Sequence, residues 1–117
     1  MPKEEDLQNA VAKYLSLQYP NLLWCHIPNG FYGGYKQAKR FLKQGLRPGM
    51  PDIMIYHPIQ VEDTYEKCGL AIELKVKGGQ IRDTQWKVLT QLSDAGWETH
   101  ICYEFDEVKK IVDDYLL

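Results

Sequence analysis

Two segments decide the fold: Gly49-Met50-Pro51-Asp52-Ile53-Met54-Ile55-Tyr56 and Leu70-Ala71-Ile72-Glu73-Leu74-Lys75-Val76. Both segments are apolar runs of strand length that carry charge where a core strand should carry none. In the second run, successive side chains alternate between the two faces of the strand, so Glu73 and Lys75 share a face. If the two strands are neighbours, Asp52, Glu73 and Lys75 converge. Two carboxylates beside an amine suit a divalent cation and phosphate-ester chemistry.

The rest of the chain supplies helices and further strands around these two runs. Apolar spacing and end signals predict the following elements: helices at residues 3–19, 36–44, 83–95 and 106–115, and strands at 22–27 and 98–103. In the helix at 36–44, Ala38, Phe41 and Leu42 are expected to pack inward. Residues 58–68 are predicted to be an exposed connection. Because there is no internal repeat or linker, we expect a single domain over residues 1–117. This order of elements predicts an α/β (α+β) fold, with a mixed central sheet flanked by helices.

Composition narrows the class of protein. The chain has 117 residues, of which 44% are hydrophobic, as in folded globular domains. It has no apolar run of the roughly 20 residues that a membrane span needs, and its N-terminus does not resemble a signal peptide, so we expect a cytoplasmic protein with no membrane partner. Its three cysteines are widely spaced and are expected to be reduced. The three histidines are scattered and are expected to be packed or exposed rather than metal ligands.

Charge is segregated along the chain although the formal net charge is only −2. Residues 27–51 contain no Asp or Glu but include five cations: Lys36, Lys39, Arg40, Lys43 and Arg47. A solvated helix face would explain such a run, but three interleaved aromatic residues favour contact with nucleic-acid phosphates. No base-reading motif accompanies the cations, so we expect recognition of nucleic-acid shape rather than of sequence.

Taken singly, each part of the charged patch has an ordinary explanation. A Glu-x-Lys pair on a strand is usually a solvated salt bridge, and Asp after Pro is usually part of a turn. The combination is more specific, because Pro51-Asp52 opens one apolar strand, Glu73 and Lys75 lie on another, and a helix bearing Gln85 follows directly.

Several motifs, in this order, resemble the PD-(D/E)XK nuclease superfamily, and in particular its small stand-alone VRR-NUC domains from phages and bacteria. The matching segments are Glu4-x-x-Leu7-Gln8, Asn29-Gly30, Arg47-Pro48-Gly49-x-Pro51-Asp52, Glu73-x-Lys75, Gln85 and Ala95-Gly96-Trp97. The resemblance covers nearly the whole chain and implies a restriction-endonuclease-like sheet. The segment from His57 to Gly69 departs from the pattern because it is longer than the minimum, which would allow a subunit contact there.

The resemblance also implies roles for individual residues. Asp52, Glu73 and the backbone carbonyl of Leu74 would bind Mg²⁺ or Mn²⁺, and Lys75 would orient the attacking water and help to deprotonate it. Gln85 would position that water or Lys75. Glu4, or alternatively Glu5, would hold a metal-bound water or a second ion.

The implied activity is metal-dependent hydrolysis of phosphodiester bonds in structured DNA, best described as Holliday-junction resolvase-like. The DNA-binding residues would be the five cations together with Asn29 and Tyr32. Two symmetric cuts in a four-way junction require two active centres, so a homodimer is expected. The alternatives are a non-catalytic nucleic-acid-binding subunit, or a flap, repair or restriction-type nuclease on the same fold.

Overall fold

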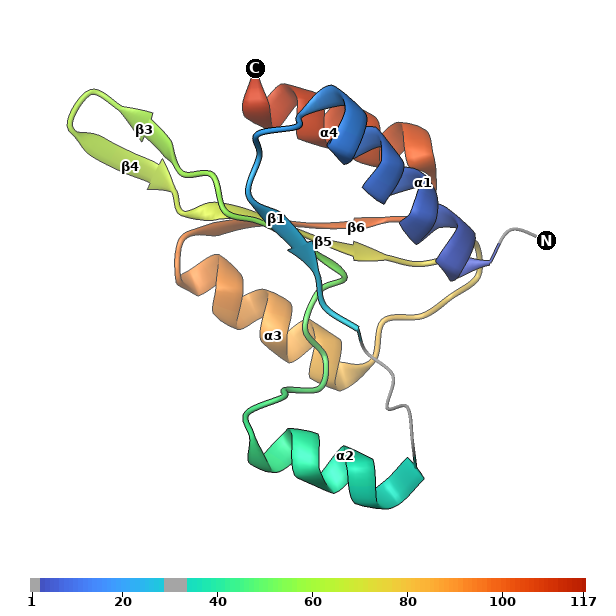
Figure 1. Ribbon diagram of the computed structural model, residues 1–117. Helices are drawn as coiled ribbons and strands as arrows, with labels where there is room; N and C mark the ends of the chain where they lie inside the picture. The colour runs from blue at the N-terminus through green and yellow to red at the C-terminus, as the bar shows by residue number, and fades with distance from the viewer. Residues whose placement is uncertain (1–2, 29–33) are drawn as a thin grey trace.

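A computed structural model describes residues 3–28 and 34–117 and contains a mixed four-stranded sheet between two layers of helices (Figure 1). The elements in chain order are α1 (Glu4–Gln18), β1 (Trp24–His26), α2 (Gly34–Lys43), β2 (Ile53–Ile55), β3 (Ile59–Val61), β4 (Thr64–Lys67), β5 (Gly69–Leu74), α3 (Asp83–Asp94), β6 (Trp97–Cys102) and α4 (Phe105–Leu116). The sheet order is β1-β2-β5-β6, with antiparallel pairing except between β5 and β6, which are parallel. The predicted mixed sheet flanked by helices is therefore confirmed.

Strand β5 is the centre of the molecule. All six of its residues are buried, because α1 and α4 cover one face of the sheet and α3 covers the other (Figure 1). Its register places Ile72 opposite Ile53 of β2 and His100 of β6. This double coverage explains the nearly continuous apolar sequence and leaves Glu73 as the exception.

The main core lies between the sheet and the pair α1 and α4. Its buried members are Val11, Leu15, Ile53, Ile55, Leu70, Ile72, Leu74, Cys102, Val108, Val112 and Tyr115. The two helices are also joined by a polar clamp, in which the hydroxyls of Tyr14 and Tyr19 each donate a 2.6 Å hydrogen bond to Asp113. Together with Lys109, these bonds lower the pKa of Asp113 to about 2. Helix α1 is thereby held firmly over the sheet.

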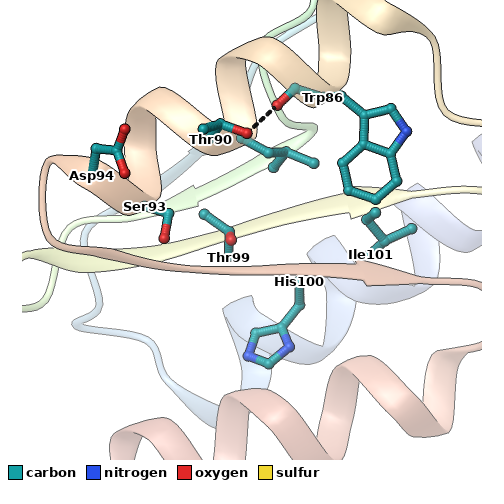
Figure 2. A pocket seen from close by; sticks show the side chains of 8 residues that line it. Trp86, Thr90, Ser93, Asp94, Thr99, His100 and Ile101 are labelled. Carbon is teal, nitrogen blue, oxygen red and sulfur yellow. Dashed lines mark hydrogen bonds between the residues drawn. The ribbon is translucent and has the colours of Figure 1, made fainter.

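On the other face, α3 packs against β6 and leaves a cleft of about 290 Å³ between them. Figure 2 shows the alternation of β6: Thr99 and Ile101 point towards α3, whereas His100 points to the opposite face. Trp86 on α3 lies over this cleft and is half exposed. Helix α3 ends just before Gly96, whose positive φ of 97° suits a glycine after a helix.

The prediction for residues 58–68 was wrong in one respect. The segment is exposed, but it forms a β-hairpin, β3 and β4, that projects from the body of the molecule (Figure 1). A two-residue turn, Glu62-Asp63, joins the strands, and Glu62 adopts a left-handed φ of 56°. Strands of three and four residues flanking such a turn are too short to show a clear alternation in the sequence.

Helix α2 differs from the other helices because it buries none of its residues. The expectation that Ala38, Phe41 and Leu42 pack inward was wrong: Ala38 is only half buried, and Leu42 is 45% exposed. The reason is that α3 already covers that face of the sheet, and α2 lies beyond it (Figure 1). None of the helices within residues 3–28 and 34–117 is both long and apolar enough to cross a bilayer.

Candidate active site

Asp52 is fixed by contacts on both of its sides. The loop before it passes so close to α3 that a Cβ on Gly49 would lie 2.8 Å from the Thr84 carbonyl oxygen. The Asp52 carbonyl accepts hydrogen bonds from Ile27 N at 3.0 Å and from His26 Nδ1 at 2.8 Å. Its carboxylate accepts the Leu74 N–H at 2.8 Å, so Asp52 bridges β2 to the end of β5.

Glu73 is a carboxyl group buried in the centre of the sheet, with only 1% of its surface exposed. Gln85 Nε2 donates to Glu73 Oε1 at 3.1 Å, but Oε2 is buried with no hydrogen-bond partner among the residues that the structure describes. Burial, and next the neighbouring Asp52 carboxylate, raise the pKa of Glu73 to about 9, while the Lys75 ammonium acts in the opposite direction. A buried oxygen without a donor is costly unless something binds it.

Gln85 is held in place by the start of its own helix. Its Oε1 accepts the backbone N–H of Arg82 at 2.9 Å, which turns the amide nitrogen towards Glu73. We predicted from the resemblance that Gln85 would position water or Lys75. The contact seen in the structure is with Glu73, and the positioning role stays a prediction.

Lys75 and Glu4 complete the cluster from two different layers. Lys75 is 8% exposed, and its Nζ lies 4.0 Å from Glu4 Oε1 on the first turn of α1. One carboxylate oxygen from each of Glu4, Asp52 and Glu73 lies within 4.8 Å of the others. The structure thus brings the predicted acids and lysine together, and of the two N-terminal candidates it is Glu4 that joins the cluster.

The donor set fits a divalent cation. Three carboxylates this close would repel one another if all were ionised, a conflict that the raised pKa of Glu73 reflects, and a cation among them removes that cost. Hard carboxylate oxygens are the ligands that Mg²⁺ prefers, and Glu73 Oε2 is a buried oxygen that receives no hydrogen bond from a donor in the described part of the chain. The remaining predicted ligand is the backbone carbonyl of Leu74. Leu74 lies beside the cluster, and the role of its carbonyl stays a prediction.

Two acids of the cluster, Glu4 and Asp52, line a cleft of about 330 Å³ between α1 and the strands β1 and β2. Its lining residues are Glu4, Glu5, Gln8, Asn9, His26, Asp52 and Leu74. Gln8 Oε1 is a second buried acceptor with no hydrogen-bond partner in the described part of the chain. His26 and Asn9 were not predicted as site residues. Only the pairing of β1 with β2, which places His26 opposite Ile53, reveals the position of His26.

The predicted DNA-binding cations lie away from the acids. Lys36, Lys39, Arg40 and Lys43 are exposed on α2, and Arg47 is exposed in the loop that follows. Lys39 Nζ lies 5.5 Å from the centre of the Tyr35 ring. Among residues 3–28 and 34–117, no ion pair joins these cations to the acid cluster. The two other predicted DNA contacts, Asn29 and Tyr32, lie outside the described residues.

Comparisons with known proteins agree with this arrangement. The family model of the VRR-NUC domain matches residues 2–105. A solved structure described as a VRR_NUC domain protein superposes with a TM-score of 0.76 and 20% sequence identity, covering 98% of this chain and 88% of that one. At this identity the likeness concerns the fold. No curated protein sequence gives a significant match.

Proposed function

Because the chain belongs to the VRR-NUC domain family, a family of nuclease domains, we propose that it is a metal-dependent endonuclease that hydrolyses phosphodiester bonds in branched DNA. The observation that carries this proposal is the convergence of Glu4, Asp52 and Glu73 beside Lys75, with one oxygen of Glu73 buried and partnerless among the described residues. A protein that only bound DNA would gain nothing from three acids at this point, because they repel phosphate.

The chain's own groups divide the work. Asp52, Glu73 and the Leu74 carbonyl would hold Mg²⁺ or Mn²⁺, with Glu4 at the exposed side of the cluster. When bound, such an ion lowers the pKa of water and stabilises the leaving oxygen. The Lys75 ammonium orients the attacking water and offsets the negative charge that develops on the scissile phosphate. Gln85 acts through Glu73, whose carboxylate it keeps in position.

Branched DNA is the proposed substrate because recognition is separated from chemistry. The cations of α2 lie on a helix away from the acids, an arrangement that suits contact with a second DNA arm. One chain offers one acid cluster among its described residues, so a Holliday-junction resolvase would act as a two-fold homodimer.

The test is Mg²⁺-dependent cleavage of a synthetic four-way junction compared with a linear duplex of the same sequence. Preferential and symmetric cutting of the junction is expected. Equal cutting of both substrates would leave a nuclease but remove the resolvase assignment, and no metal-stimulated cutting of either would favour a non-catalytic DNA-binding subunit.

Lys75→Ala tests the site itself. We expect cleavage to fall by about 100- to 1,000-fold, with junction affinity little changed, because the ammonium acts mainly on charge developed during the reaction. Lys13→Ala, which removes an exposed lysine further along α1, is the matched control and should cleave normally. Unchanged turnover in Lys75→Ala would contradict the proposed role.

A further inference from the structure

A second and larger cleft, of about 450 Å³, lies on the other side of the first turns of α1. Its apolar lining consists of Leu7, Ala10, Val76, Tyr103 and Phe105. These residues come from α1, from the chain just after β5, and from the junction of β6 with α4. It therefore opens at the carboxyl ends of two neighbouring parallel strands, where α/β sheets commonly bind ligands.

This apolar cleft and the acid cleft are two sides of the same structural unit. Glu4 and Gln8, one helical turn apart, line the acid cleft, while Lys3, Leu7 and Ala10 line the apolar one. The end of β5 is divided in the same way, since Leu74 lines the first cleft and Val76 the second. One helix width, about 10 Å, separates them, so a DNA strand in the acid cleft can reach the apolar cleft within a few nucleotides.

The aromatic walls of the apolar cleft are held in place by the protein. Phe105 packs edge-to-face against Tyr14, with ring centres 5.6 Å apart. The backbone N–H of Tyr103 donates to Glu107 at 3.0 Å at the start of α4, and the Tyr103 side chain itself is partly exposed. A preformed apolar cleft with an accessible aromatic ring is suited to a flat apolar group.

Charged residues at the cleft narrow the choice of occupant. Lys3 and Lys77 line it together with Asp6 and Glu104, so the formal charges cancel. A phosphate group alone is therefore disfavoured as the occupant. A neutral ring fits this cleft better, because the phosphates next to it in the strand can reach Lys3 and Lys77. The carboxylates can accept hydrogen bonds from exocyclic amino groups of bases.

We propose that this apolar cleft binds an unstacked nucleobase of the DNA strand whose scissile phosphate lies in the acid cleft, with Tyr103 as its stacking partner. The inference rests on the proposed function and adds to it, because it makes the enzyme select DNA in which a base close to the cut is free to leave the stack. Branch points meet this requirement more easily than uninterrupted duplex does.

The experiment is a scan with abasic sites. Four-way junctions that carry a single abasic site at successive positions around the mapped cut are titrated with protein, with Ca²⁺ in place of Mg²⁺ to measure binding alone. For the wild-type protein we expect one position at which loss of the base weakens binding at least about fivefold, the lower end of what stacking on an aromatic residue contributes.

Two variants identify the cleft as the cause. Tyr103→Ala should bind the intact junction at least about fivefold more weakly and should show no further penalty at that position. Ala10→Trp, at an exposed position of α1, fills the cleft and should behave in the same way. The matched controls are Trp86→Ala, which removes an aromatic ring from the cleft between α3 and β6 (Figure 2), and Ser16→Trp on α1, and both should keep the wild-type profile.

The outcomes separate this inference from the proposed function. If the wild-type protein cuts junctions but its abasic profile is flat, or if the penalty persists in Tyr103→Ala, the base-binding inference is wrong and the nuclease proposal stands. If Ala10→Trp leaves DNA binding unchanged but alters the mass of the protein in solution, the cleft holds a second copy of the chain and the inference is wrong. If the wild-type protein neither binds nor cuts DNA, both proposals fail.

Discussion

Glu73 is buried in the central strand and held by Gln85 from the neighbouring helix, whereas the cations of α2 are exposed on a helix that buries none of its residues. The acid cluster draws on three segments that pack around one core, namely α1, the start of β2 and the end of β5. Helix α2 has no comparable support within the described part of the chain.

The buried cluster and the exposed helix are suited to different tasks, catalysis and attraction of DNA. Chemistry at phosphorus requires groups held within a fraction of an ångström, and burial among packed elements supplies that rigidity. Attraction of a polyanion requires only accessible positive charge, which acts over a Debye length of about 8 Å at physiological salt. Changes in the cluster should therefore alter turnover, and changes in α2 should alter affinity and its dependence on salt.

Glu73→Gln shares the largest expected effect with Lys75→Ala. It keeps the shape of the side chain but removes a carboxylate ligand, so turnover at saturating DNA should fall by about 100- to 1,000-fold. Single-turnover cleavage across a range of Mg²⁺ concentrations measures this change. Recovery of the wild-type rate at high Mg²⁺ would show that Glu73 contributes to affinity for the ion alone.

The same variant makes the electrostatic cost of the site visible in the metal-free protein. Below pH 4.5 the Glu73 carboxyl is protonated in both the folded and the unfolded chain, and between pH 4.5 and about 9 only the folded chain keeps the proton. The unfolded state then binds fewer protons, so the free energy of unfolding should fall as pH rises through this window, by up to about 1.4 kcal/mol per unit. Urea unfolding in EDTA at pH 5.5, 7 and 8.5 should show this slope in the wild-type protein and a flatter one in Glu73→Gln.

Helix α2 provides the second and smaller effect. Lys36→Gln combined with Lys43→Gln should weaken junction binding about tenfold and reduce the slope of log Kd against log salt concentration by about one for each phosphate that the helix no longer neutralises. Turnover at saturating DNA and the free energy of unfolding should hardly change, because neither residue is buried.

The matched control for α2 removes the same charge elsewhere. Lys13→Gln combined with Lys110→Gln takes two exposed lysines from α1 and α4, and it should leave the salt slope nearly unaltered. Equal slopes for the two double variants would mean that α2 is only a solvated helix. The division of labour between α2 and the acid cluster would then be wrong.

The sequence could predict the acid cluster because its signals are local. Pro51-Asp52 opens one apolar run and Glu73-x-Lys75 closes another, and a charged residue within a strand that is otherwise buried marks a site without knowledge of distant contacts. The alternation of each run also predicts which side chains share a face. Adjacency of the two strands then brings the three residues together.

The remaining features depend on distant parts of the chain. His26 reaches Asp52 only through the register of β1 on β2, which no local pattern specifies. The amphipathic pattern of α2 predicted inward packing, but the face of the sheet that it would have covered is occupied by α3. The partner of Gln85 follows from its bond to Arg82 N, a capping geometry that fixes the direction of the amide.

Asp113→Asn has the smallest expected effect on turnover. It tests whether the contact between α1 and α4 gives the acid cluster its rigidity. The Asp113 carboxylate accepts hydrogen bonds from the hydroxyls of Tyr14 and Tyr19. It thereby links α4 to α1, the helix that carries Glu4. An amide still accepts hydrogen bonds but loses their charge assistance, so the free energy of unfolding at pH 7 should fall by about 1–2 kcal/mol. Because the pKa of Asp113 is lowered to about 2, this difference should be lost as pH falls from about 4 through 2.

Turnover distinguishes the two explanations for this clamp. If the clamp only stabilises the fold, Asp113→Asn at 20 °C should bind Mn²⁺ and cleave DNA as the wild-type protein does. If it also positions α1, Mn²⁺ affinity should drop while junction binding through α2 stays constant. Asp114→Asn, which removes the exposed partner of Lys110 one position further along, is the control and should alter neither stability nor metal affinity by a measurable amount.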